Sequence, residues 1–409
     1  MVNAKEAQLE FLNWEFGVFF HFGIRTFYEG RKDWDMEPMA LSAFDPRELD
    51  CEEWIRTVWE AGGKYAVLVC KHHDGFANWP SAYTEYSVKN TPWKNGGGDV
   101  VREFVDACRK YDIKVGLYYS PAQFGSAKLS AKEYDDYFIN QIRELLTNYG
   151  RIDYLWFDGC GSENHTYDTK RIVKEIRACQ PQILLFNMWD PDTRWVGNEA
   201  GIAHSPNYLT VDALDFSVLT EDRRALGQAK FLPAECDCRM RLENWFYSDN
   251  DVHTLKSVDE LMAIYFASVG RGANLLLNIG PDRNGKLPNA DAERIIQFGN
   301  TVKELFDENN EVKGIVEHSK NVTSITFDEF KLVNIIILSE EISGNCEIEN
   351  FEVHSFLRPH GQKISVYQSF TIGHKKICIF PTASSNKIEI SFDKDKKVDA
   401  KAYYVPAFR

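Results

Sequence analysis

Short apolar runs alternate with helix-like stretches through the first three quarters of the chain. Seven runs are mostly apolar, at residues 18–23, 64–73, 114–121, 154–159, 183–187, 230–236 and 274–281. Continuous runs of this length are typical of strands that are buried on both faces, as in a parallel sheet. Amphipathic stretches lie between several of them, at 99–111, 132–150 and 257–272, and the last one opens with the capping-box spacing from Ser257 to Glu260.

This alternation predicts an α/β fold, a somewhat irregular TIM-type (β/α)8-like barrel. We expect its eighth strand near 211–218, and an irregular stretch of the barrel over the turn-rich residues 188–229. After about residue 310 the segments become short, β-branched and alternating, which is typical of an antiparallel β-sandwich. The chain is therefore expected to hold two domains, a catalytic barrel over 1–308 and a C-terminal β-sandwich over 309–409.

The composition narrows the class of partner. The 409 residues are 44% hydrophobic and carry a formal net charge of −14 at pH 7, which disfavours nucleic acid or an anionic membrane as a partner. The sequence contains no run of 18 apolar residues, so we expect no membrane span, and its first residues lack the pattern of a signal peptide. Nine cysteines, an odd number, are simplest to explain in a reducing compartment, so we expect a cytoplasmic protein of unknown oligomeric state.

Function in a (β/α)8 barrel gathers at the carboxyl ends of its strands, so the residues that finish the apolar runs are candidates. Asp158 follows YLWF and is either a catalytic carboxylate or a helix-capping or turn residue. Glu235 lies in FLPAECDC, where burial would raise its pKa as a general acid requires. The alternative is a salt bridge from Glu235 to Arg239 or Arg241, and Asp237 competes for the acid role.

Metal and phosphate sites are weakly indicated. His72 and His73 are neighbours on an expected strand end, and strand alternation would direct them to opposite faces. The chain has no HExxH motif, and Cys236-x-Cys238 has no second pair. The glycine-rich segment 95–101 lacks the phosphate-loop pattern and is better explained as a turn with Asp99 as a helix cap. We therefore expect neither a metal nor another cofactor.

Several motifs taken together resemble one enzyme family. They are HFG (21–23), CKHHDGFANWPS (70–81), DVVREFVDACRKYDIKVGLYYSP (99–121), LWFDG (155–159) and GANLLLNIGPDRNGKLP (272–288). They resemble the α-L-fucosidases of glycoside hydrolase family 29, over residues 11 to about 308. PAECDC (233–238) with NWFY (244–247), and RWVGNEAG (194–201), are similar to the subgroup that acts on α-1,3/1,4-linked fucose.

The resemblance implies a retaining, exo-acting enzyme that releases L-fucose from a fucosylated oligosaccharide or glycoconjugate by double displacement. By position, Asp158 would be the nucleophile and Glu235 the acid/base. The residues that would hold the sugar are His21, Asp33, Trp34, His72, His73, Tyr119, Trp156, Arg241 and Trp245. Retention requires the two carboxyl groups about 5–5.5 Å apart.

The sequence departs from the family at two places. Asp33 stands where the family has Glu, and Leu242-Glu243-Asn244 replaces the subgroup's Pro-Gly, on the side expected to shape the leaving group. Two alternatives stay open. One is a glycosidase for a related sugar such as L-galactose, because a pocket rejects one added hydroxyl only weakly by apolar contact. The other is a non-catalytic fucose-binding protein.

Overall fold

The computed structural model describes residues 3–30, 38–122, 129–161, 165–215, 223–342 and 348–406. In this part of the chain eight parallel strands form a barrel that runs β5-β4-β3-β2-β1-β10-β9-β6. They are β1 (Phe16–Phe20), β2 (Tyr65–Lys71), β3 (Lys114–Tyr119), β4 (Tyr154–Phe157), β5 (Leu184–Phe186), β6 (Arg194–Trp195), β9 (Ala234–Arg239) and β10 (Asn274–Ile279). A parallel bridge between Phe186 and Thr193 brings the two end strands together, which almost closes the barrel.

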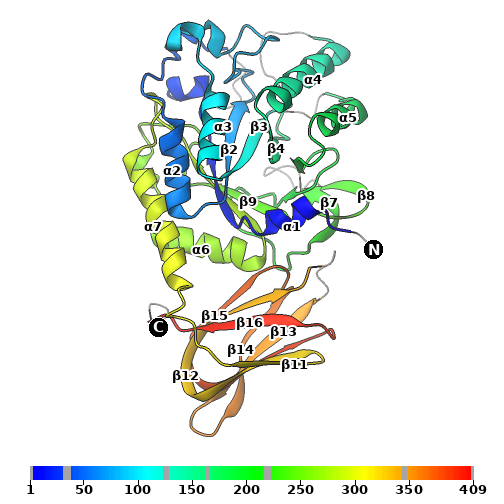
Figure 1. Cartoon of the computed structure of the whole chain (residues 1–409), viewed down its shortest axis with the longest axis vertical. Helices are drawn as coiled ribbons and strands as arrows, with labels where there is room; N and C mark the ends of the chain where they lie inside the picture. Colours follow the sequence, from blue (N-terminus) through cyan, green and yellow to red (C-terminus); the bar gives the residue numbers. More distant parts are fainter. Residues whose placement is uncertain are drawn as a thin grey trace.

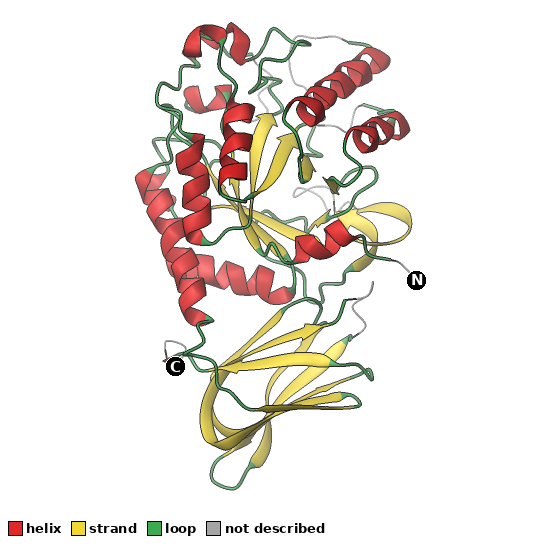
Figure 2. Ribbon diagram, in the orientation of Figure 1, coloured by secondary structure: helices red, strands yellow, loops and turns green. Residues whose placement is uncertain are grey.

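Helices cover the outside of the barrel (Figures 1 and 2). They are α2 (Cys51–Ala61), α3 (Val100–Lys110), α4 (Ala131–Asn148), α5 (Thr169–Cys179), α6 (Val258–Ser268) and α7 (Asn289–Leu305). The expected caps are confirmed: Asp99 accepts the amide hydrogen of Arg102, and Ser257 and Glu260 form a reciprocal capping box. In the described part of the chain no helix combines the length and apolar character needed to cross a membrane.

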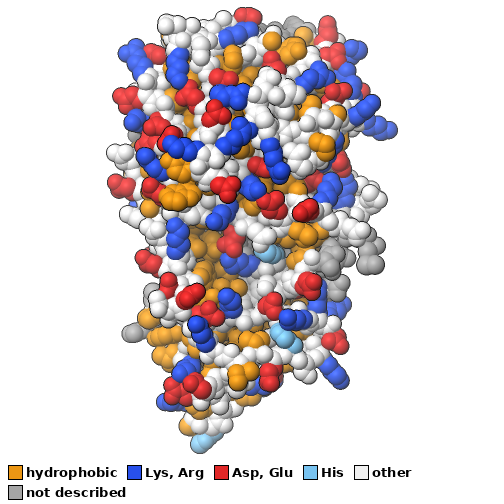
Figure 3. Space-filling view, in the orientation of Figure 1, with side chains coloured by type: hydrophobic (Ala, Val, Ile, Leu, Met, Phe, Trp, Pro, Cys, Tyr) orange, Lys and Arg blue, Asp and Glu red, His pale blue; other side chains and the backbone are white. Residues whose placement is uncertain are grey.

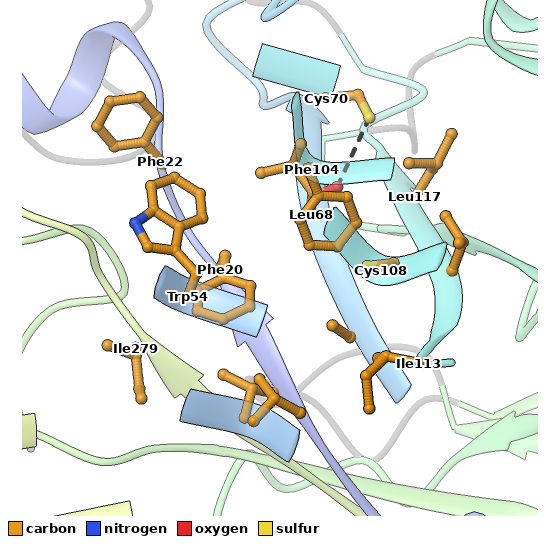
Figure 4. Packing of buried hydrophobic residues seen from close by; sticks show 14 of the residues in the cluster. Phe20, Phe22, Trp54, Leu68, Cys70, Phe104, Cys108, Ile113, Leu117 and Ile279 are labelled. Atoms are coloured by element: carbon orange, nitrogen blue, oxygen red, sulfur yellow. Dashed lines mark hydrogen bonds between the residues drawn. The ribbon is translucent and has the colours of Figure 1, made fainter. Parts of the chain in front are cut away.

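Side chains of the barrel strands alternate between two cores. Outward side chains such as Phe20 and Leu68 pack against α2 and α3, where Phe20 stacks on Trp54 at 5.3 Å (Figure 4). The inward side chains are mainly aromatic and form a separate cluster. The short helix α1 (Glu6–Leu12) helps to close the amino end of the barrel, because Phe11 lies 5.4 Å from Tyr154 and Trp14 lies 5.2 Å from Tyr65. Only the carboxyl end is therefore left for a pocket.

The expected eighth strand was misplaced. Residues 210–215 do form a strand, β7 (Thr210–Asp215), but it pairs with β8 (Arg223–Phe231) in a hairpin outside the barrel. The eighth barrel strand is β6, inside the stretch expected to be irregular. A strand of two residues is too short to produce an apolar run, which explains the error.

The C-terminal strands form the expected antiparallel β-sandwich. They are β11 (Ile315–Ser319), β12 (Val322–Glu340), β13 (Asn350–Leu357), β14 (Gln362–Phe370), β15 (Lys376–Phe392) and β16 (Val398–Tyr403). All six are hydrogen-bonded in one sheet, in which the first half of β12 pairs with β11 and its second half with β16. Lys375 donates to Glu15 at 2.7 Å, and Ile377 packs beside Gly270. Glu15 and Gly270 precede β1 and β10, so this domain lies at the amino end of the barrel (Figure 1).

The contact between α2 and α7 allows a test of the packing. A methyl group on Gly299 would lie 1.9 Å from the carbonyl oxygen of Ala61. Overpacking typically costs about 1–3 kcal/mol, and here the clash is with backbone that cannot rotate away. Gly299→Ala should therefore lower the free energy of unfolding by about 2 kcal/mol or more in urea titrations. The neighbouring exposed variant Asn300→Ala should stay within about 0.5 kcal/mol of wild type, and equal losses would contradict this packing.

Candidate active site

Asp158 follows β4 directly and lies at the carboxyl end of the barrel. Its Oδ2 accepts a hydrogen bond from the Tyr118 hydroxyl at 2.8 Å, and its Oδ1 accepts one from the Cys160 amide at 2.9 Å. Its side chain is 26% exposed, so it can meet a ligand. Two directed donors fix the orientation of this carboxyl group.

The tyrosine beside Asp158 is Tyr118, and the prediction of Tyr119 was wrong. Tyr119 points outward, where its hydroxyl donates to Gln141 at 2.6 Å and its ring packs on Phe138. Tyr118 points inward and stacks on His72 at 5.5 Å. Neighbouring strand residues face opposite sides of a sheet, so an error of one position moves the side chain out of the site.

The three predicted histidines come together near Asp158. His21 donates from Nδ1 to Oδ1 of Asn278 at 2.6 Å, because the Asn278 amide nitrogen already donates to the Trp245 carbonyl. Burial lowers the pKa of His21 to about 3, so its Nε2 is a hydrogen-bond acceptor at neutral pH.

His72 and His73 face the same site, contrary to the expectation from alternation. β2 ends at Lys71, so both follow the strand in a turn, and their rings lie 4.3 Å apart. Nδ1 of His73 lies 2.6 Å from the Ser120 hydroxyl, and its Nε2 lies 3.4 Å from Oδ2 of Asp158. One potential ligand atom from each of His72, His73 and Asp158 lies within 4.8 Å of the others, so distance alone would permit a cation. The expected absence of a metal stays a prediction.

Two tryptophans supply apolar surface. Trp156 points into the barrel and stacks on Phe186 at 4.1 Å and on Tyr118 at 5.4 Å. Trp245 is half-buried and packs against His21 at 5.0 Å, with the Arg239 guanidinium 5.3 Å from its ring. Rings between hydrogen-bonding groups suit a sugar, which has apolar faces and a hydroxyl rim.

The prediction that Arg241 holds the sugar is wrong. Its guanidinium binds Asp291 through two hydrogen bonds of 3.0 and 2.7 Å and Asp251 through one of 2.9 Å, and it also donates to the Ser248 carbonyl. Few donors remain for a ligand, so Arg241 holds the loop after β9 in place. The arginine at the end of the strand is Arg239. The predicted residues Asp33 and Trp34 lie outside the described residues.

Glu235 does not lie at a carboxyl end. Pro233 interrupts the apolar run, β9 starts at Ala234, and Glu235 pairs with Asn274, the first residue of β10. Its carboxyl group is fully buried and accepts hydrogen bonds from Tyr65 and Trp156 at 2.8 Å and from Tyr154 at 3.3 Å. Burial raises its pKa to about 8. Glu235 therefore holds the Trp156 indole from below and is badly placed for an acid/base.

A carboxyl group that the sequence analysis did not identify lies at the carboxyl end of the barrel. Glu199 follows β6, is half-buried, and sits next to Ala200, which bridges to Cys238 near the end of β9. Burial and the charge of Asp158 raise its pKa, while Arg239 opposes that shift. The signal was present in RWVGNEAG, but no apolar run ends at this glutamate.

The loop that carries Glu199 is held under strain. Glu199 has φ 48°, an uncommon value for a residue with a side chain, and Gly197 and Gly201 have φ 85° and 72°. A Cβ at Gly197 would lie 2.8 Å from Asp215 of β7, and one at Gly201 would lie 2.9 Å from the Cys238 sulfur. The loop is thus fitted between the hairpin and β9, which fixes the position of Glu199.

The buried state of Glu235 predicts a pH effect on stability. The folded protein keeps this proton up to about pH 8, whereas the unfolded chain releases it near pH 4.5. Between these values the folded state binds more protons, so this group makes the free energy of unfolding fall as pH rises, by up to about 1.4 kcal/mol per pH unit. Chemical denaturation at pH 5, 6, 7 and 8 should show a shallower decline for Glu235→Gln than for wild type. The exposed control Glu293→Gln should keep the wild-type slope; identical slopes for all three proteins would refute the burial argument.

Comparisons with known proteins agree with this geometry. A family model for α-L-fucosidase matches residues 2–305. The chain is 30% identical to Alpha-L-fucosidase 1 of Arabidopsis thaliana, over 94% of this chain and 83% of that protein. It is 34% identical, with a TM-score of 0.88, to the crystal structure of a putative α-L-fucosidase from Bacteroides ovatus, over 99% of this chain and 74% of that one.

A further solved relative is a glycoside hydrolase family 29 fucosidase from Ruminococcus gnavus in complex with fucose. It is 25% identical with a TM-score of 0.82, over 100% of this chain and 96% of that one. The family match covers the whole barrel and therefore every candidate residue described above. The chain belongs to the α-L-fucosidases of glycoside hydrolase family 29 and is a glycoside hydrolase.

Proposed function

We propose that this α-L-fucosidase is a retaining, exo-acting enzyme in which Asp158 is the nucleophile and Glu199 the acid/base. The observation that carries the proposal is the pairing of two carboxyl groups with opposite environments at the barrel mouth. Asp158 accepts two hydrogen bonds from fixed donors, whereas burial and the charge of Asp158 raise the pKa of Glu199. One group is thus suited to attack as a carboxylate and the other to hold a proton.

The first step forms a covalent sugar–enzyme ester. An Asp158 oxygen bonds to the anomeric carbon while the bond from that carbon to the leaving oxygen breaks, and Glu199 gives its proton to that oxygen. The Tyr118 hydroxyl and the Cys160 amide hold Asp158 in position for the attack. In the second step Glu199 takes a proton from water, the water oxygen bonds to the anomeric carbon, and Asp158 leaves as a carboxylate.

Glu199 suits the acid role better than Glu235, which the sequence had indicated. The leaving oxygen of an exo-acting enzyme lies toward the pocket opening, where the rest of the glycan extends. Glu235 is fully buried below Trp156 and its two oxygens already accept three hydrogen bonds. Moving it to the mouth would leave buried donors unpaired, at a cost of about 1–3 kcal/mol for each.

The sugar would lie among His21, His72, His73, Trp156 and Trp245. Nε2 of His21 can accept a hydrogen bond from a sugar hydroxyl, and the tryptophan rings can cover the apolar face and methyl group of fucose. The structure of the R. gnavus relative is a complex with fucose, which supports the same ligand here. A related-sugar glycosidase and a non-catalytic binding protein are not favoured, because the relatives described above are fucosidases.

We further propose that the substrates are α-1,3/1,4-fucosylated oligosaccharides and that the enzyme is cytoplasmic. The linkage is supported by the resemblance of the segments PAECDC, NWFY and RWVGNEAG to the α-1,3/1,4-selective subgroup; NWFY carries Trp245 and RWVGNEAG carries Glu199. The compartment is supported by the eight cysteines of the described residues, all of which are free thiols. On the face shown in Figure 3, acidic and basic side chains are interspersed, as expected for a protein that binds an uncharged glycan.

The roles of the two carboxyl groups are tested by azide rescue. Asp158→Ala should lose nearly all activity on an aryl α-L-fucoside, and azide should enter from the vacated side to give the inverted β-fucosyl azide. Glu199→Ala should lose about 10²–10⁴-fold on an oligosaccharide, much less on an aryl fucoside with an acidic leaving group, and give the retained α-fucosyl azide. Glu235→Ala is the matched control and should form no azide product. Rescue of Glu235→Ala in place of Glu199→Ala would return the acid role to Glu235.

Linkage preference is tested with three substrates: an aryl α-L-fucoside, a Lewis-type α-1,3/1,4-fucosylated oligosaccharide and an α-1,2-linked isomer of that oligosaccharide. We expect the wild type to release fucose from the branched oligosaccharide, with kcat/KM at least about 10-fold higher than on an α-1,2-linked isomer, a ratio that corresponds to about 1.4 kcal/mol. Chromatography of released fucose gives the rates. Equal rates on both isomers would keep the fucosidase and remove the subgroup assignment.

A further inference from the structure

A third carboxyl group lies inside the barrel between Glu235 and Arg239. Asp237 is the fourth residue of β9, and it pairs with Leu276 of β10, whose side chain belongs to the inward aromatic cluster. Alternation along β9 therefore directs Asp237 inward, one layer above Glu235 and one below Arg239. It therefore lies one layer below Arg239, which ends the strand at the carboxyl end of the barrel.

The hydrogen bonds of Asp237 leave part of its carboxyl group available. Its Oδ1 accepts the Trp195 indole hydrogen at 2.7 Å, and among the described residues no other side chain donates to it. Glu235, two residues earlier, accepts from three side chains. Besides Trp195, only its own backbone amide hydrogen-bonds to this carboxyl group within the described part of the chain. Buried carboxyl groups are normally well satisfied, and Asp237 is 4% exposed, so it retains acceptor capacity for a ligand donor.

The neighbours of Asp237 include the two carboxyl groups that we propose to take part in the reaction. Burial raises the pKa of Asp237 to about 7, and the nearby charges of Glu199 and Asp158 add to this shift. The backbone also joins Asp237 to the loop that carries Glu199, because the Gly201 amide donates to the Asp237 carbonyl at 3.1 Å. Asp237 therefore lies near the two groups that flank the anomeric carbon in the proposed reaction.

We propose that Asp237, oriented by Trp195, binds the 2-hydroxyl of the fucosyl ring. This inference rests on the proposed function. The 2-hydroxyl is the ring hydroxyl on the carbon next to the anomeric centre, so it is the one within reach of a group close to both Asp158 and Glu199. Hydrogen bonds to this hydroxyl strengthen as the oxocarbenium-like transition state develops, so the contact should assist the chemical step as well as binding.

The test combines a protein substitution with removal of single hydroxyls from the substrate. Wild type and Asp237→Asn are compared on 4-nitrophenyl α-L-fucoside and on its 2-deoxy, 3-deoxy and 4-deoxy forms. Asp237→Asn keeps the size of the side chain and one oxygen to accept from Trp195. It should lower kcat/KM on the parent substrate by about 10–100-fold, as expected for the loss of a hydrogen bond to a charged group. On the 2-deoxy substrate the two proteins should agree within about 3-fold, because the partner of Asp237 is already absent.

Each other outcome overturns the assignment. The 3-deoxy and 4-deoxy substrates should show the full loss for Asp237→Asn; a loss that disappears with one of these instead would move the contact to another hydroxyl. Equal losses on all four substrates, or no loss on any, would show that Asp237 does not touch the sugar. Glu235→Gln serves as the matched control from the same strand, and its effect, whatever its size, should be the same on all four substrates.

Two measurements keep the result interpretable. If Asp237→Asn does not fold, judged by its melting curve, Asp237→Ser is put through the same four substrates. Failure of the proposed function is distinguished by the wild type itself, because a protein that does not hydrolyse the parent fucoside refutes the fucosidase mechanism. Wild-type hydrolysis with no selective effect of the 2-deoxy substrate refutes the Asp237 contact alone.

Discussion

The position at which β9 begins decides the chemistry of the site. Alternate residues of a barrel strand point inward, so a start at Ala234 places Glu235, Asp237 and Arg239 inside the barrel in three successive layers. Pro233 has no amide hydrogen to donate, and the strand starts directly after it. A shift of one residue would have turned all three charged groups toward the helices, where the outward core offers them few partners.

These layers separate the carboxyl groups by environment. At the bottom, burial raises the pKa of Glu235 to about 8, and three donors tie it to the wall. One layer up, the pKa of Asp237 is about 7 and one side chain holds it. At the mouth, Glu199 is half-buried and Asp158 is partly exposed between two donors. The barrel thus provides a buried, neutral clamp at the bottom and, at the mouth, the partly exposed carboxyl group that we propose as the nucleophile.

The sequence predicted the barrel and the sandwich well because seven of eight strands are long enough to produce apolar runs. The same reasoning placed Asp158 and the three histidines, which follow or end such runs. It failed where a position depends on register or on a long-range partner. Tyr119 was chosen over Tyr118 because a run of apolar letters does not show which face each residue takes. Arg241 could not be separated from Arg239, since its acidic partner Asp291 is 50 residues away.

Glu199, the proposed acid/base, was missed for a different reason, which lies in the irregular part of the barrel. A regular barrel has a helix after its sixth strand, but here the chain forms the β7–β8 hairpin, and β6 has only two residues. The loop between β6 and the hairpin is fixed by close contacts at Gly197 and Gly201 and holds Glu199 at φ 48°. Strain of this kind costs about 1–3 kcal/mol and persists only where the surroundings enforce it. The side that carries the proposed acid/base is thus built by the departure from regular barrel structure, whereas the side that carries the proposed nucleophile follows the regular strand β4.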